Sequence, residues 1–288
     1  MDAEEVQASI TIAIVSFISG IAFNGLLPFS SYLAVLTLLG FSANLLLQIQ
    51  KVRSFYKNRR LREAFISLAL GMTFINPISY AADYLPFRMQ FYLASLALYH
   101  YAEYLYVCYF HYVQLSFDSF LLNQSISYVV AVNVSFLEFT ILYNYYDFYE
   151  ILPFPLVILI MLIGLIMVLI GHFFRIGAEF TAGANFNHKI QFHKDEKHKL
   201  VTHGLYAVSR HPSYFGWFMW AVGTQVFMLN PLSTLLFLAT SFYFFKSRIE
   251  IEEEILLEFF EQEYSDYTKK VGILIPFIKG FQGYDTKY

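Results

Sequence analysis

Apolar runs recur along the chain, and each is about as long as a helix needs to be to cross the roughly 30 Å hydrocarbon core of a bilayer. Backbone polar groups in lipid must be paired within the protein, so spanning runs of this kind form helices. The sequence therefore predicts an all-α integral membrane protein with about eight transmembrane helices. The predicted spans are 8–26, 29–49, 63–83, 87–113, 124–144, 152–173, 212–229 and 231–248.

Composition supports the membrane class and excludes others. Of the 288 residues, 57% are hydrophobic and only 14% are charged, which exceeds what a soluble core requires. The formal net charge of −3 argues against a nucleic-acid partner, because phosphate binding requires clustered basic surface. Cys108 is the one cysteine, so neither a disulfide framework nor a cysteine-rich metal site is expected. The acidic N-terminus does not begin like a cleavable signal peptide, so the first run is expected to remain as a span.

Loop charges predict the orientation. The loop 51–62 is rich in lysine and arginine and is expected in the cytosol, whereas the acidic, aromatic loop 144–150 is expected on the other side. Counting spans from these loops places both termini, the polar connector 177–207 and the charged tail after 248 in the cytosol. The turn at Asn230-Pro231 is too short to cross anything, so 212–229 and 231–248 are predicted to form a tight helical hairpin.

We predict two regions. Residues 1–173 hold membrane helices one to six, and residues 174–288 form a catalytic region. The catalytic region comprises a cofactor-binding connector (174–211), the helical hairpin (212–248) and a cytosolic C-terminal helix with its tail (249–288).

Arg210, His211 and Pro212 stand where the connector meets the seventh span. Proline fits the first turn of a helix, so Pro212 is expected to start that span. The free N–H groups of this turn and the His211 ring would then face the connector, where an anion or ribose hydroxyls can bind. The alternative is that Arg210 and His211 merely flank a helix at the interface.

Arg248 and Glu252 are four residues apart and share a helix face at the end of the last span. An arginine there can hold a carboxylate through two hydrogen bonds, and a glutamate can bind a cation or an amino group. The alternative is an exposed ion pair, which contributes little to stability. The neighbouring glutamates are expected to form a solvated face: Glu250, Glu253, Glu254 and Glu258.

Other polar residues have simpler interpretations. His188, His193 and His198 are spaced by five and lack an accompanying cysteine, so a metal site is not favoured. Ionisable residues at membrane depth normally face a helix bundle interior, so His100 and Glu103 are expected to join helices by hydrogen bonds.

A long ordered series of residues in the last third of the chain resembles the isoprenylcysteine carboxyl methyltransferase family. The matching residues are 181–188, Gln191, 198–201, 204–206, 210–217, 223–225, Asn230-Pro231, Arg248, the Glu252 cluster, Phe259-Phe260, Tyr264, Tyr267 and Pro276-Phe277. Related membrane enzymes carry similar but shorter C-terminal patterns.

The resemblance implies methylation of the C-terminal carboxylate of a farnesyl- or geranylgeranyl-cysteine by S-adenosylmethionine. The implied substrates are prenylated proteins such as small GTPases, in contact with membrane lipid at the endoplasmic reticulum; a monomer is favoured. The candidate catalytic residues are Arg248, Glu252 and Arg175, and Arg248 is also expected to bind substrate. Arg175 is included because Glu179 follows it by one helical turn and it adjoins the matching 181–183 stretch. The candidate cofactor contacts are Gln191, His198, Lys199, Leu200, Val201, Tyr206, His211, Pro212, Ser213, Tyr214 and Glu252.

Other functions remain as alternatives. A phospholipid amine N-methyltransferase would need an aromatic pocket around its amine, and an arginine at the nucleophile would repel a cationic substrate. A sterol reductase would need a more basic dinucleotide site. A transporter would often show two related halves, which the sequence lacks, and a non-catalytic scaffold would not need the whole motif series.

Overall fold

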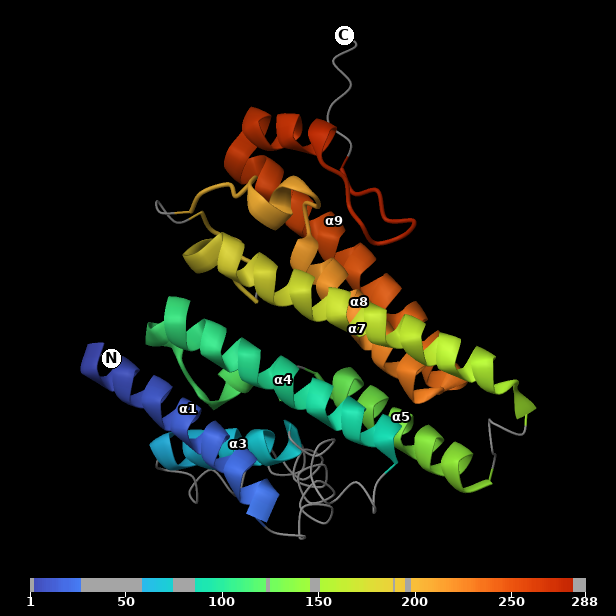
Figure 1. Cartoon of the computed structure of the whole chain (residues 1–288). Coiled ribbons are helices and arrows are strands. Elements are labelled where there is room, and N and C mark those ends of the chain that lie inside the picture. Colours follow the sequence, from blue (N-terminus) through green and yellow to red (C-terminus); the bar gives the residue numbers. More distant parts are fainter. Residues whose placement is uncertain are drawn as a thin grey trace. The chain divides into compact units, whose positions relative to one another are not determined.

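The computed structural model describes residues 3–26, 59–74, 86–122, 125–145, 151–188, 190–194 and 198–281. Every regular element in those ranges is a helix (Figure 1). The chain forms two compact units. The first contains residues 1–158 and 227–233, and the second contains residues 159–226 and 234–288. The predicted boundary between residues 173 and 174 stays a prediction. The two compact units meet instead between residues 158 and 159, inside the same long helix.

The first unit contains α1 (Ala3–Leu26), α3 (Arg59–Phe74), α4 (Phe87–Phe110) and α5 (Ile126–Tyr145), and α3 packs against α1 and α4. Three predicted spans, 8–26, 87–113 and 124–144, coincide with α1, α4 and α5. The span predicted at 63–83 begins inside α3, and the one at 29–49 lies outside the described residues.

Two polar side chains of the first unit join helices: His100, for which the sequence predicts this role, and Glu138. His100 of α4 is fully buried, and its ring nitrogens contact the Phe120 carbonyl at 2.8 Å and the Tyr128 hydroxyl at 2.9 Å. Glu138 of α5 accepts hydrogen bonds from the backbone N–H groups of Leu232 and Ser233, at 2.8 and 2.6 Å. This carboxylate caps the free N-terminus of the helix that begins at Pro231 and so fixes the turn of the hairpin.

The second unit is built on α7 (Phe154–Ala182), α8 (Pro212–Met228) and α9 (Pro231–Lys270), with two short 3-10 helices, η5 (Gly183–Asn185) and η6 (Gly204–Ala207). Glycines let α7 and α8 approach closely. A Cβ at Gly223 would lie 2.6 Å from the Met167 Cβ, and one at Gly216 would lie 2.4 Å from the Arg175 backbone nitrogen. Small residues at such contacts are typical of packing between membrane helices.

The last helix differs from the expectation. The sequence predicts a span that ends at 248 and a separate helix after it, but α9 continues from Pro231 to Lys270 and breaks at Glu261, where φ is 45° and ψ is −119°. The break, and not the end of the apolar run, redirects the chain. The part of α9 after Arg248 therefore extends directly from the apolar part and carries its residues at fixed angles to Arg248.

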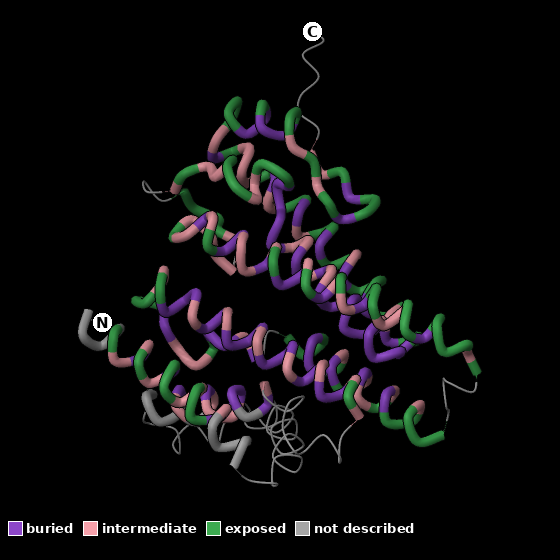
Figure 2. Tube along the Cα trace, in the orientation of Figure 1, coloured by how far each residue is buried: buried purple, intermediate pink, exposed green. Residues whose placement is uncertain are grey.

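The surface of the long helices is apolar. By length and mean hydropathy, two helices in the described ranges are able to cross a membrane, Ile126–Tyr145 and Phe154–Asn185. Figure 2 shows a largely exposed face along α7, and large apolar residues occupy it in the second unit: Leu159, Leu162, Ile163, Ile166, Leu169, Phe173 and Phe180. Such a surface suits lipid. The count of eight spans stays a prediction.

Candidate functional site

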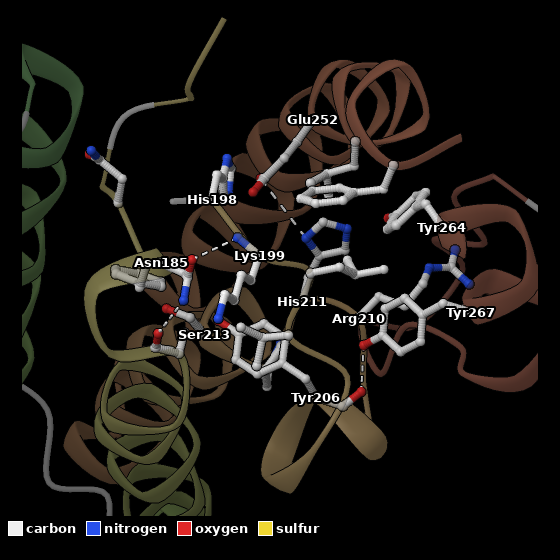
Figure 3. A pocket seen from close by; sticks show the side chains of 18 of the residues that line it. Asn185, His198, Lys199, Tyr206, Arg210, His211, Ser213, Glu252, Tyr264 and Tyr267 are labelled. Atoms are coloured by element: carbon white, nitrogen blue, oxygen red, sulfur yellow. Dashed lines mark hydrogen bonds and ion pairs between the residues drawn. The ribbon is translucent and has the colours of Figure 1, made fainter. Parts of the chain in front are cut away.

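The second unit contains a pocket that opens to solvent. Its walls come from the end of α7, the connector, the first turn of α8 and α9 beyond Arg248 (Figure 3). The lining residues are Ala182, Asn185, Phe186, Asn187, His198, Lys199, Leu200, Val201, Tyr206, Arg210, His211, Pro212, Ser213, Tyr214, Glu252, Leu256, Phe260, Tyr264 and Tyr267.

All the candidate cofactor contacts except Gln191 lie on the wall of this pocket. Gln191 is exposed in the connector and is not a lining residue. The structure thus brings together residues from 198–206, the start of α8 and Glu252 of α9. Their role in cofactor binding stays a prediction.

Sequence reasoning missed the far wall. Leu256, Phe260, Tyr264 and Tyr267 line the pocket from α9, and Asn185 lines it from η5. Leu256 and Phe260 follow Glu252 at spacings of four, so helical periodicity would have found these two, whereas Tyr264 and Tyr267 lie beyond the break at Glu261.

The connector is held across the end of α7 by local contacts. Gly204 has φ of +57°, and a Cβ there would lie 2.7 Å from Cγ2 of Thr181, so glycine is needed for both reasons. The Lys199 backbone N–H donates to Oδ1 of Asn185 at 2.9 Å, and the Tyr267 hydroxyl donates to the Tyr206 carbonyl at 2.5 Å. These bonds fix 199–206 between α7 and α9.

A second set of contacts ties the connector to α9. Lys194 donates to the Phe259 carbonyl, and its Nζ lies 4.6 Å from the centre of the Phe260 ring. The His198 ring meets Phe259 and Phe260 edge to face. His198 therefore packs on aromatic rings, while His188 contacts arginine. That these histidines hold no metal stays a prediction.

Tyr214 links the pocket to the candidate catalytic residues. Its ring stacks on His211 at 5.4 Å with an interplanar angle of 1°. Its hydroxyl donates to Oε2 of Glu252 at 2.5 Å and accepts from Nε of Arg248 at 2.7 Å. Tyr214, a residue of α8, thus bridges Arg248 and Glu252, which share one face of α9.

Arg175 and Arg248 converge on His188. Arg175 of α7 pairs with Glu179 at 2.9 Å, donates to Oγ of Ser213 at 2.6 Å and contacts Nδ1 of His188 at 3.4 Å. Arg248 donates to the backbone carbonyl of His188 at 2.5 Å. Both guanidinium groups stand directly behind wall residues of the pocket, Ser213 and Tyr214.

The prediction that Glu253 lies on a solvated face is wrong. Its side chain is 1% exposed, and its Oε1 lies 2.7 Å from Nε of Arg210 and 3.1 Å from Nε2 of His211. The Tyr264 hydroxyl donates to the same oxygen at 3.1 Å. The physical reason is the position of Glu253 on the helix. Successive residues of an α-helix are rotated by about 100°, so Glu253 points away from the side of Glu252 and toward the connector. Glu250, Glu254 and Glu258 are exposed, as predicted.

Burial and charge act on the titratable groups of the pocket. Burial alone would raise the pKa of Glu253, but hydrogen bonds from His211 and Arg210 outweigh it and hold the pKa below its ordinary value. Burial, with the nearby carboxylate of Glu252, raises the pKa of the Tyr206 phenol well above its usual range. Glu253 is therefore an anion and Tyr206 a neutral phenol at neutral pH.

The sequence and the fold both match known proteins. Residues 162–258 match the model of the isoprenylcysteine carboxyl methyltransferase family. The protein-S-isoprenylcysteine O-methyltransferase of Xenopus laevis is 43% identical over 220 residues, which are 76% of this chain and 74% of the relative. The chain belongs to the isoprenylcysteine carboxyl methyltransferase family.

Other members of the family agree with this assignment. The human protein-S-isoprenylcysteine O-methyltransferase is 45% identical over 189 residues, which cover 66% of this chain and 65% of the relative. A solved structure of a eukaryotic intramembrane Ras methyltransferase of this family superposes with a TM-score of 0.77 at 35% identity. The match covers 95% of this chain and 99% of the solved chain, so the family fold extends beyond the last third of the sequence, where the resembling residues lie. This is a membrane protein with an all-helical fold in its described part.

Proposed function

We infer that this chain transfers a methyl group from S-adenosylmethionine to the C-terminal carboxylate of a prenylated cysteine. The curated relatives are named for O-methylation of a protein S-isoprenylcysteine, which supports the acceptor, and S-adenosylmethionine is the donor that we propose. The observation that carries the inference from the structure is the convergence of Arg175 and Arg248 on His188, behind the pocket wall. Two guanidinium groups at one place favour an anionic substrate.

The side chains that line the pocket suit the cofactor by their chemistry. Glu252 supplies a carboxylate for the positive charge of an amino acid group or a sulfonium, and the aromatic faces of Tyr206, Tyr214 and Phe260 favour a cation as well. Backbone N–H groups at the start of α8 and the His211 ring suit a carboxylate or ribose hydroxyls. S-adenosylmethionine would supply an electrophilic methyl group on sulfur.

The residues of this chain then have to position the substrate and exclude water. A C-terminal carboxylate has a reference pKa of about 3.5 and is ionised at neutral pH, so no general base is required. Arg248 is held by Tyr214 and the His188 carbonyl and can present its remaining N–H groups to the carboxylate. A dry site favours a transition state in which opposite charges neutralise each other. Arg175, fixed by Glu179 and Ser213, would position His188 and with it Arg248.

The same arrangement disfavours an amine substrate. A phospholipid amine N-methyltransferase acts on a nucleophile that is cationic before deprotonation, and two arginines at the site would repel it. The positive charge of Arg248 therefore favours the carboxyl reaction over the amine reaction.

We propose that the substrates are prenylated proteins such as small GTPases and that the enzyme is a multi-pass protein of the endoplasmic reticulum membrane. Both termini and the pocket would face the cytosol, where the cofactor is. A prenyl chain prefers lipid, so it would enter sideways between spans while its carboxylate reaches Arg248. The connector would close over the cofactor as a lid, using the contacts of Lys194 and His198 with α9.

The test uses purified protein in nanodiscs with radiolabelled S-adenosylmethionine. N-acetyl-farnesylcysteine, its methyl ester and phosphatidylethanolamine are offered separately. We expect base-labile label on the free acid alone, and its loss in Arg248→Ala. The matched control is Lys246→Ala, an exposed residue two positions away on α9 that should retain activity. Label in phosphatidylethanolamine would support the amine reaction, and label in neither would reject both.

A further inference from the structure

The segment that follows α9, residues 271–281, packs beside the apolar hairpin instead of extending into solvent. Its first part is held by Arg210, whose backbone N–H donates to the Gly272 carbonyl at 3.0 Å and whose Nη1 donates to the Val271 carbonyl at 2.6 Å. Its last part is held by the same side chain, since Nη2 donates to the carbonyls of Lys279 and Phe281 at 3.0 Å each. In Figure 1 the segment, in red, turns back beside α9. Residues 273–278 therefore form a closed loop beside Arg210.

Arg210, which holds both ends of the loop, lies two residues before the start of α8 at Pro212. The middle of the loop reaches farther along α8, toward the interior of its predicted span. Ile275 and Ile278 are buried in one cluster with Phe218 and Val222 of α8 and with residues of α9. At 1.5 Å per residue, Phe218 lies about 9 Å inside α8. The α9 members of the cluster, Phe245 and Ile249, stand at the end of the apolar part of that helix.

Among the described residues, the opposite side of the loop is apolar and exposed. Phe277 is 95% exposed, and Leu274 and Pro276 are exposed beside it. Phe277 also has φ of 65°, a strained conformation for a residue with a Cβ, which presents the ring outward. The lysines that flank the loop are exposed at its base: Lys270, Lys279 and Lys269, of which Lys269 pairs with Asp266 at 3.0 Å.

We propose that the loop 273–278 inserts into the cytosolic leaflet of the membrane as an apolar wedge, with lipid against Leu274 and Phe277. The position of the loop along α8 indicates that lipid is the occupant. The loop packs against residues of α8 that lie inside the predicted span, so the exposed ring stands at the depth of that span, where the neighbouring part of α9 also exposes apolar side chains, Tyr243 and Phe244. Lysines at the base of an apolar insertion match the anionic headgroups of a cytosolic leaflet.

This inference rests on α8 and α9 crossing the membrane as proposed, and it adds a consequence for the site. Arg210 holds both ends of the loop and adjoins His211 on the pocket wall. An inserted loop therefore fixes the cofactor pocket at the membrane surface, where the carboxylate of a prenylated cysteine would emerge from lipid.

Site-directed spin labelling tests the insertion directly, and the chain is suited to it because Cys108 is its one cysteine and is buried. In a Cys108→Ser background, single cysteines are introduced as Phe277→Cys and, independently, Leu274→Cys. Two matched controls on α9 are Leu235→Cys, 65% exposed in the apolar part, and Glu258→Cys, exposed beyond Arg248. Collision rates with oxygen, which concentrates in lipid, and with a water-soluble nickel chelate are measured in nanodiscs of phosphatidylcholine and phosphatidylserine.

We expect labels at 277 and 274 to behave like the label at 235, with a several-fold higher ratio of oxygen to chelate collisions than the label at 258. A label at 277 as accessible to chelate as the label at 258, while the label at 235 is protected, would overturn the inserted loop. Chelate access at 235 would instead reject the membrane placement of α9, and with it the basis of the inference. Methyl transfer by each labelled protein shows that the variants are folded.

Discussion

One oxygen atom, the hydroxyl of Tyr214, joins Arg248 to Glu252: it lies 2.7 Å from Nε of the arginine and 2.5 Å from Oε2 of the glutamate. Arg248 is proposed to hold the substrate and Glu252 lines the cofactor pocket. If these roles are as proposed, the hydroxyl links the substrate side of the reaction to the cofactor side through a group on a different helix.

Removing this hydroxyl tests the coupling. We expect Tyr214→Phe to retain the stacking on His211 but to lower kcat/KM for N-acetyl-farnesylcysteine by about 10- to 150-fold, since hydrogen bonds to charged groups contribute about 1.5–3 kcal/mol. Initial rates at varied concentrations of each substrate measure the loss. Tyr243→Phe, an exposed tyrosine of α9, is the control and should be unchanged. Equal activity in both variants would show that the hydroxyl bridge does not contribute.

The buried pair of Arg210 and Glu253 gives a prediction about stability. Breaking a buried ion pair by removing one charge costs about 3–5 kcal/mol, because the partner is left buried and uncompensated. We expect Glu253→Gln to lower the unfolding temperature in detergent and to expose the segment 271–281 to proteolysis. Glu254→Gln changes the adjacent, exposed carboxylate and should leave both unchanged. If the two variants melt alike, Glu253 does not hold the C-terminal segment.

The depressed pKa of Glu253 predicts how stability depends on pH. The folded pKa lies below the unfolded value of 4.5, so the ionised carboxylate stabilises the fold above that pH. The contribution is lost as the pH falls from about 4.5 through the folded pKa, because the unfolded state then binds the proton more readily. Thermal unfolding between neutral and acidic pH should show this decline in the wild type and a smaller one in Glu253→Gln. Parallel declines in both proteins would assign the acid sensitivity to other groups.

Much of this arrangement follows from local features of the sequence. Hydropathy located α1, α4 and α5, Asn230-Pro231 located the hairpin turn, and Pro212 located the start of α8, because each depends on residues adjacent in sequence. The partners of Glu253 do not follow from local features of the sequence. Arg210 and His211 lie more than forty residues away, and a run of glutamates carries no mark of which carboxylate turns inward. The backbone break at Glu261 likewise falls within a charged run that carries no proline or glycine, so the sequence placed the end of the first helix at 248 instead of at Glu261.

The close approach of α7 and α8 gives the last prediction. A Cβ at Gly223 would lie 2.6 Å from Cβ of Met167 and 3.0 Å from the backbone nitrogen of Val168, so the two helices would have to separate. Overpacking of this kind typically costs about 1–3 kcal/mol, and we expect Gly223→Ala to lower the unfolding temperature in detergent. Gly272→Ala is the matched control, because nothing lies within 4 Å of the added Cβ. Since alanine also favours the helix of α8, an unchanged unfolding temperature in Gly223→Ala would mean that α7 and α8 adjust at no cost, and that the glycine contact does not set their spacing.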